Sequence, residues 1–149
     1  MKTGFKNLDE KVEVNKGNLM VIASRPAMGK TTLALNILSH IALEDKKTVL
    51  FVSLESNEEN IINRLIISNS MVEVKKFELY NKYKNKEIQK SNLSEEDLDR
   101  IKYRIKLLKN SPIYIMSGAP YCIKEICKKS RTLKEEKDRE LIITDYVQL

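Results

Sequence analysis

The sequence predicts an α/β fold in which a mostly parallel sheet is flanked by helices. Short apolar stretches alternate along the chain with longer stretches in which apolar residues recur at helical spacing. The short stretches are apolar at nearly every position, which is typical of parallel strands covered on both faces. With 149 residues, of which 42% are hydrophobic and 32% charged, the chain is expected to form one domain with a sizeable core.

Four strands are expected, each a short apolar or β-branched run that ends at a turn or loop. They lie at residues 18–24 (NLMVIAS), 47–55 (KTVLFVSLE), 112–116 (PIYIM) and 139–149 (RELIITDYVQL). Because helices are expected between them, the strands should be parallel and joined by right-handed crossovers.

The helices between these strands are predicted from apolar residues that share one helical face. The four faces are Ala34, Ile37, Leu38 and Ile41; Ile61, Ile62, Leu65 and Ile66; Leu98, Ile101, Ile105 and Leu108; and Ile123, Ile126, Cys127 and Ser130. Ser56 and Glu59 have the spacing of a capping box, and Ser94 is expected to cap the third helix. Residues 71–93 are charged and predict helix plus loop, within a helical segment that spans 72–111 between the second and third strands.

The net charge of +6 is concentrated around KKFELYNKYKNKEIQK. A nucleic-acid contact surface and a solvated helical face would both give this pattern, and the solvated face is favoured. Cys122 and Cys127 do not have a zinc-ligand spacing and are expected to be reduced thiols in or near a helix. No apolar run approaches the roughly 20 residues of a membrane span, and the N-terminus lacks an apolar signal region, so a cytoplasmic protein without membrane contact is expected.

The stretch between the first strand and the first helix nearly matches the phosphate-binding pattern G-x-x-x-x-G-K-[ST]. Its eight positions are Ser24, Arg25, Pro26, Ala27, Met28, Gly29, Lys30 and Thr31. Only the first glycine is replaced, by serine. The strand before it and the helix after it are those that the pattern requires.

The order of these residues follows from the chemistry of phosphate. Backbone N–H groups at the loop and helix start can bind phosphate oxygens, and Gly29 lets the backbone approach without a Cβ. Lys30 would place a positive charge on the β- and γ-phosphates, Thr31 would offer a hydroxyl to Mg²⁺, and Thr32 could reach a phosphate. Pro26 stiffens the loop. A helix start that merely contains Gly-Lys-Thr is the alternative, and the surrounding elements count against it.

Hydrolysis would need two further acidic groups. Asp145 follows an apolar run, where a buried strand should emerge at the carboxyl edge of the sheet, and it could hold the water shell of Mg²⁺. Glu55 ends the second predicted strand and could act as general base toward the attacking water. The alternatives are that Asp145 is a plain residue of a strand-ending turn, and that Glu55 only favours the start of the next helix.

Several of these motifs together resemble the ATPase domain of the DnaB-type replicative DNA helicases. They are TGFKNLDEKV, GNLMVIASRPAMGKTTLALNI, VLFVSLESNEENIINRL and LIITDYVQL, in that order along essentially the whole chain. The resemblance also accounts for Ser24, because a residue other than glycine is common there in this family. Thr144 and Val147 depart from its usual residues, and neither departure removes a reacting group.

The resemblance implies a RecA-like P-loop NTPase core, ATP and Mg²⁺ as ligands, and a hexameric ring that moves along single-stranded DNA. By position, it implies that Lys30 and Thr31 bind triphosphate and metal, Glu55 is the catalytic carboxylate and Asp145 the metal-site aspartate. It also implies that residues 1–149 are a partial domain, incomplete at the C-terminus, without the γ-phosphate sensor, the DNA-contacting loops and the arginine finger. The chain alone is therefore expected to be weakly active or inactive as an ATPase. The missing strands should also leave an open sheet edge, which favours unwanted pairing or aggregation.

Two other functions are compatible with the motifs. A truncated, non-enzymatic helicase-like protein could bind or regulate helicase rings, and the reading frame beyond Leu149 would distinguish it from a helicase. A small-molecule kinase would share the phosphate loop, but the sequence shows no lid arginines for it.

Overall fold

Three parallel strands form the sheet of the computed structural model, which describes residues 1–83, 93–118 and 121–145. Their order is β2-β1-β3, and the strands are β1 (Val49–Ser53), β2 (Ile113–Met116) and β3 (Leu141–Asp145). Both neighbours of β1 run parallel to it. The predicted α/β class is therefore confirmed, and three of the four predicted strands form.

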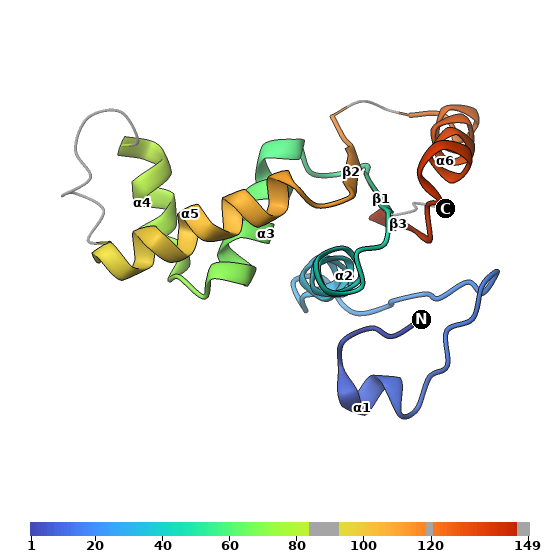
Figure 1. Ribbon diagram of the computed structural model, residues 1–149, viewed down its shortest axis with the longest axis horizontal. Helices are drawn as coiled ribbons and strands as arrows, with labels where there is room; N and C mark the ends of the chain where they lie inside the picture. Colours follow the sequence, from blue (N-terminus) through green and yellow to red (C-terminus); the bar gives the residue numbers. More distant parts are fainter. Residues whose placement is uncertain (84–92, 119–120, 146–149) are drawn as a thin grey trace.

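Helices cover both faces of the sheet because β1 is apolar at successive positions. Val49 and Phe51 pack against α2 (Lys30–Ser39) and the π-helix η1 (His40–Glu44) that continues it. Leu50 and Val52 point the other way and pack with Leu133 of α6 (Ile123–Lys137). Figure 1 shows α2 and α6 on opposite sides of the strands.

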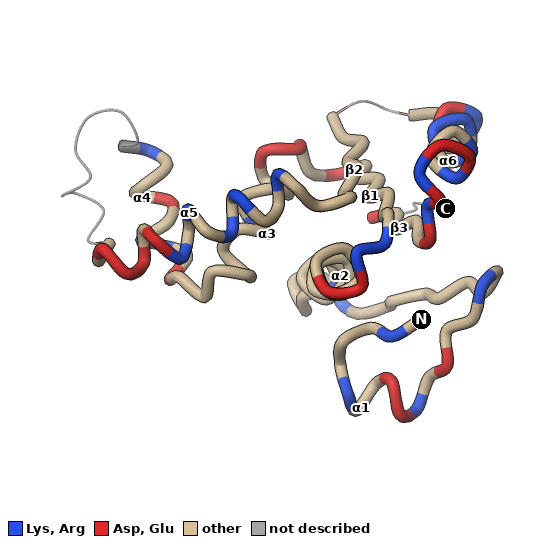
Figure 2. Tube along the Cα trace, in the orientation of Figure 1, with Lys and Arg blue, Asp and Glu red and all other residues tan. Residues whose placement is uncertain are grey.

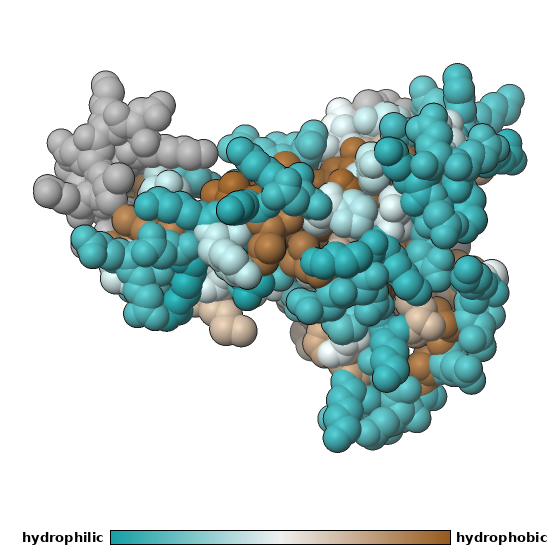
Figure 3. Space-filling model, in the orientation of Figure 1, coloured by the Kyte–Doolittle hydropathy of each residue, from teal (hydrophilic) through white to brown (hydrophobic). Residues whose placement is uncertain are grey.

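A helical arm extends sideways from the sheet, between β1 and β2 in the chain (Figure 1). Its helices are α3 (Glu58–Ser70), α4 (Val74–Tyr83) and α5 (Glu95–Lys109). The arm has its own small core, formed by Ile66, Val72, Phe77 and Ile101. Figure 3 shows a hydrophilic surface over most of one face, with apolar atoms gathered where the arm meets the sheet.

Charges of both signs are mixed along the arm (Figure 2). Ion pairs join Lys76 to Asp97 at 3.9 Å and Lys102 to Asp99 at 3.7 Å. This mixture is typical of a solvated helical face, in agreement with the favoured interpretation of the basic stretch. Part of that stretch, residues 84–92, lies outside the described residues.

The predicted first strand is wrong. Residues 18–25 run without strand pairing, and the side chains of Leu19 and Val21 are 89% and 76% exposed. Met20 and Ile22, on the other side of the same segment, pack against the main core. The segment pairs with none of the described strands, although β2 and β3, as the edge strands of the described sheet, each have only one neighbour.

One of the two predicted N-terminal helix caps is wrong and the other is confirmed. Asn57, rather than Ser56, caps α3, and its side-chain oxygen accepts the backbone N–H of Asn60 at 2.9 Å. Ser94 caps α5 as predicted and forms a capping box with Asp97. Cys122 and Cys127 are free thiols at the start of α6 and within it.

The N-terminal segment is held by one carboxylate. Asp9, the last residue of α1 (Lys6–Asp9), accepts hydrogen bonds from the backbone N–H and the hydroxyl of Thr3, both at 2.7 Å. Gly4, which follows Thr3, lies so close to His40 that a Cβ at this position would be 2.6 Å from the imidazole Cγ. The bonds of Asp9 thus fix the segment internally, and the close approach of Gly4 to His40 seats it on the end of α2. Within the described residues, no helix is both long and apolar enough to cross a bilayer.

Candidate functional site

The predicted phosphate-binding loop lies directly before α2 and is open to solvent. Residues 24–29 and Thr32 are exposed, while Lys30 and Thr31 are half-buried. Ala27 and Gly29 both have left-handed backbone conformations, with φ of 60° and 84°. Left-handed residues in a short loop turn successive N–H groups toward one side, which forms the concave anion sites known as nests. Glycine is favoured at position 29 by this φ rather than by space, because a Cβ added there would have no neighbouring atom within 4 Å.

The backbone N–H groups of this loop are free to bind an anion. Those of Ala27, Met28 and Gly29 donate to no acceptor within the described part of the chain. The carbonyl of Gly29 accepts the N–H of Leu33 at 2.9 Å, so the helix begins immediately after the loop. A solvent-exposed helix start with free amides is the arrangement that binds phosphate in many proteins.

The start of α2 also lacks the acidic and capping groups found at two other long helices. No side chain caps it, and its first turn contains no acidic residue. By contrast, α3 has Asn57 with Glu58 and Glu59, and α5 has Ser94 with three acidic residues. A cation, Lys30, stands instead at the positive end of the helix dipole, which is unfavourable unless an anion joins it. The Lys30 ammonium donates to the carbonyl oxygen of Ser24 at 3.4 Å, across the loop.

The two predicted carboxylates come from neighbouring strands at one edge of the sheet. Ser53, the last residue of β1, lies opposite Asp145, the last residue of β3. The backbone N–H of Leu54 then donates to the carbonyl oxygen of Asp145 at 2.9 Å. Glu55 follows in a bend and is exposed. Since both strands point their carboxyl ends to the same side, the two acidic residues lie at the same edge.

No hydrogen bond or ion pair within the described residues joins the loop to either carboxylate. The roles of Lys30, Thr31, Glu55 and Asp145 toward ATP and metal therefore stay predictions. The chemical groups that these residues carry nevertheless suit Mg-ATP. Free amides and an ammonium suit phosphate, whereas a hydroxyl and carboxylates suit Mg²⁺.

Sequence reasoning missed one polar residue at this edge. The hydroxyl oxygen of Ser53 accepts the backbone N–H of Ser56 at 2.9 Å, although the side chain is buried. Ser53 could have been found because it is a serine at the end of an apolar strand. The backbone N–H three residues later lies before the helix and therefore needs an acceptor outside it.

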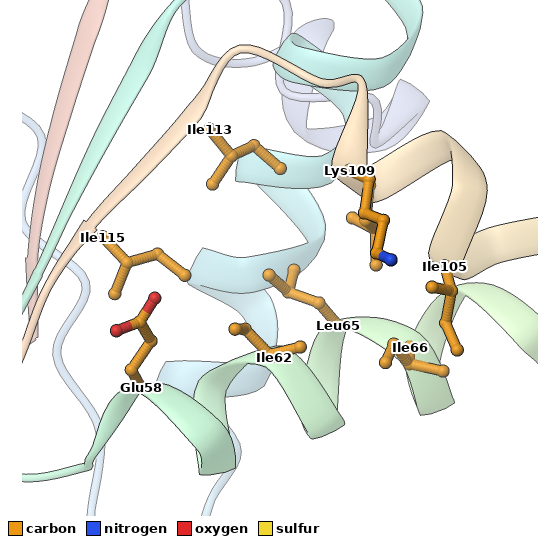
Figure 4. Close-up of a pocket in the computed structure, with 9 residues that line it drawn as sticks. Glu58, Ile62, Leu65, Ile66, Ile105, Lys109, Ile113 and Ile115 are labelled. Atoms are coloured by element: carbon orange, nitrogen blue, oxygen red, sulfur yellow. The ribbon is translucent and has the colours of Figure 1, made fainter.

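An apolar pocket of about 280 Å³ lies elsewhere, between α3, α5 and β2 (Figure 4). Ile62 and Leu65 line it from α3, and Ile113 and Ile115 from β2. None of the predicted site residues lines this pocket. It belongs to the junction of the helical arm with the sheet rather than to the phosphate loop.

A parallel sheet between two helical layers, with this loop before an uncapped helix and acidic residues at neighbouring strand ends, defines the class of P-loop α/β domains. Comparison with known families makes the assignment specific. The family model of the DnaB-like helicase C terminal domain matches residues 1–149, and the chain belongs to this family. This result confirms the resemblance that the sequence motifs indicated.

Individual relatives agree with the family. The chain is 36% identical to the replicative DNA helicase DnaB of Buchnera aphidicola subsp. Baizongia pistaciae over 152 residues. It is 32% identical to a probable plasmid replicative DNA helicase of Chlamydia trachomatis and 31% identical to the replicative DNA helicase DnaC of Bacillus subtilis, each over 148 residues. These matches cover 99% to 100% of the chain but only 30% of each relative.

Solved structures support the RecA-like fold. One solved ATPase domain is 25% identical and superimposes with a TM-score of 0.69, over 83% of this chain and 40% of that one. A DnaB-like replicative helicase, in a structure that describes its interactions with primase, gives a TM-score of 0.61 at 24% identity. That match covers 81% of this chain and 27% of the other, and it supports the fold alone.

Proposed function

We propose that this chain binds Mg-ATP and forms the nucleotide-binding part of a replicative DNA helicase. The observation that carries the proposal is the start of α2, where free amides, a left-handed Gly29 and Lys30 meet without a cap or an acidic residue. Such a helix start is electrostatically incomplete, and a triphosphate would complete it. Family membership makes ATP the expected triphosphate.

Each predicted residue then has a distinct role. Lys30 neutralises the β- and γ-phosphates, Thr31 contributes its hydroxyl to the metal, and Thr32 contacts a phosphate from the next helical position. Asp145 holds water molecules of the metal shell. When bound, Mg²⁺ withdraws charge from the phosphate oxygens. Glu55 accepts the proton of the attacking water, which its exposed position at the sheet edge allows.

The activity of the whole protein is part of the same proposal. Its relatives are named replicative DNA helicases, and the chain spans about 30% of their length. We therefore propose ATP-driven movement along single-stranded DNA, duplex unwinding and a hexameric ring for the full-length protein. A cytoplasmic location is part of the same proposal, and it is supported by relatives that are named as replicative DNA helicases of bacteria.

Calorimetry of Mg-ATP binding tests the proposal directly. Lys30→Ala should weaken binding by about tenfold or more, because a charge-assisted contact with the phosphates is lost. Lys129→Ala, which removes an exposed lysine of α6, is the matched control and should bind as the unchanged chain does. Equal affinity for the unchanged chain and Lys30→Ala would refute the phosphate-binding role.

A further inference from the structure

The bend between β1 and α3 is anchored on both sides of Glu55. On one side, the N–H of Leu54 donates to the Asp145 carbonyl at 2.9 Å, which ties the bend to β3. On the other side, the N–H of Ser56 donates to the Ser53 hydroxyl oxygen, also at 2.9 Å. Both neighbours of Glu55 are therefore fixed by hydrogen bonds through their amides.

Ser53 is placed for this role by the strand itself. It is the last residue of β1, its side chain is only 1% exposed, and it lies opposite Asp145 in the parallel register. Serine has the smallest side chain that can accept a hydrogen bond from a backbone N–H at this position. An alanine would fit the same space but would leave the amide of Ser56 without that acceptor.

We propose that Ser53 is a positioning residue, whose hydroxyl oxygen holds residues 54–56 so that Glu55 stays at the sheet edge where β3 ends at Asp145. The inference rests on the proposed function, because it gives Glu55 the role of general base. A displacement of about 1 Å in such a base is enough to slow a reaction substantially. Ser53 itself touches neither phosphate nor metal in this proposal.

The alternative is that the Ser53 bond only supports the start of α3. The structure gives that task to another residue, since Asn57 caps α3 through its own bond to the N–H of Asn60. In both cases a side-chain oxygen accepts the backbone N–H of the residue three positions later. Glu55 lies between acceptor and donor only in the Ser53 bond, which makes Asn57→Ala a matched control.

The first test is single-turnover ATP hydrolysis by the chain in excess over labelled ATP, a format that can follow the weak hydrolysis expected of residues 1–149 alone. We expect Ser53→Ala to slow hydrolysis about 3- to 10-fold with unchanged Mg-ATP affinity, and Ser53→Thr, which keeps the acceptor, to restore most of the rate. Ser53→Cys fills the space but accepts a hydrogen bond only weakly, so it should resemble Ser53→Ala. Asn57→Ala should lower the Tm and leave the rate unchanged. In a Glu55→Gln background, Ser53→Ala should have no further effect.

A second readout does not depend on turnover. The ¹³C signal of the Glu55 carboxyl, assigned by its loss in Glu55→Gln, should shift when Mg²⁺ and a non-hydrolysable ATP analogue are added. The shift should persist in Ser53→Thr and fall to less than about half in Ser53→Ala and Ser53→Cys, because the carboxylate is no longer held near the site. Equal shifts in all four proteins would overturn the positioning role.

The two proposals fail in different ways. If Lys30→Ala binds Mg-ATP as tightly as the unchanged chain, the proposed nucleotide site itself is refuted. If Lys30→Ala loses binding and Glu55→Gln slows hydrolysis, but Ser53→Ala matches the unchanged chain in rate and in the Glu55 signal, only the role of Ser53 is refuted.

Discussion

The backbone N–H of Leu54 donates to the carbonyl oxygen of Asp145, so the chain carries one more hydrogen bond from β1 to β3 beyond the last paired residues. This bond fixes where the two strands end relative to each other. Glu55 follows Leu54 directly, and the Asp145 side chain is on the residue that accepts the bond. A candidate base and a candidate metal ligand are thereby brought to one sheet edge, although 90 positions separate them in the chain.

The metal role of Asp145 predicts a specific defect. Asp145→Asn should raise the Mg²⁺ concentration needed for ATP binding by about tenfold, because a neutral amide holds the water shell of the metal less well than a carboxylate. The measurement is a Mg²⁺ titration at fixed ATP. Asp138→Asn is the control, since Asp138 is exposed and pairs with Lys134 at the end of α6. The same Mg²⁺ dependence in both variants would contradict the assignment.

The backbone of the loop predicts a second result. Gly29→Ala should destabilise the fold by about 1 kcal/mol, because a side chain is strained at φ of 84°, and should also weaken Mg-ATP binding about tenfold. Gly17→Ala is closely matched, with φ of 85° and open space around its Cβ, but it lies outside the loop. Urea unfolding should therefore show similar losses for both variants, and calorimetry should separate them. Similar loss of ATP affinity in both would mean that the strain acts through overall stability.

The N-terminal segment predicts a dependence of stability on pH. Hydrogen bonds from the hydroxyl and the backbone N–H of Thr3 hold the pKa of Asp9 below its ordinary value of 3.8. A carboxyl whose pKa is lower in the folded state stabilises the fold above the unfolded pKa, and this contribution is lost as the pH falls through the folded one. Asp9→Asn should therefore be less stable than the unchanged chain near pH 6, and the difference should shrink below about pH 4.

Thermal unfolding between about pH 6 and about pH 3 measures this difference. Glu10→Gln removes an exposed carboxylate next to Asp9 and serves as the control, with no loss expected near neutral pH. Glu140 adds to the same acid sensitivity in every variant. Its hydrogen bond from the ammonium of Lys47, at 3.2 Å, lowers its pKa below 4.5. A stability difference between Asp9→Asn and the unchanged chain that does not vary with pH would contradict the account.

The separate core of the helical arm predicts that the arm can be weakened without loss of nucleotide binding. Phe77→Ala removes the largest buried side chain of that core, and it should cost about 3 kcal/mol. Hydrogen exchange should rise in α4 and in the part of α5 near Ile101, while Mg-ATP affinity stays unchanged. An equal rise in β1 and β3 would show instead that the arm and the sheet unfold together.

Much of the fold follows from local pattern. The helices and the strands from residue 47 onward were predictable because apolar spacing along a segment determines which element it forms. The predicted faces are wrong at Ile62 and Ile123, which are 38% and 71% exposed. The stretch 18–24 has the same apolar character, yet a strand also needs a neighbour to bond with, and local pattern does not supply one. The predicted cap at Ser56 was also wrong. Ser56 and Asn57 are both good cap residues, and their residue types alone do not decide at which of them the helix begins.

The candidate site, like the fold, could be predicted from the sequence only in part. Ser24 to Thr31 are contiguous, so their pattern alone predicts a phosphate loop, and the role of these residues stays a prediction. The prediction that Glu55 and Asp145 lie at one edge of the sheet required the assumption that both strands are parallel, and the sheet confirms that assumption. Ser53 was missed because its partner is a backbone amide, which leaves no trace in residue type.

The two-sided burial of β1 has a consequence for how its alignment is specified. Val49 to Val52 are apolar on both faces, so sliding the strand by one position would exchange one apolar face for another at little cost. A side-chain contact at the start of the strand works against such a slip. The Thr48 hydroxyl donates to the Lys137 carbonyl at 2.8 Å, and only a residue with a side-chain donor could make this bond at that place. A single polar contact at the start, rather than the apolar middle, thus helps to set which acids share the far edge of the sheet.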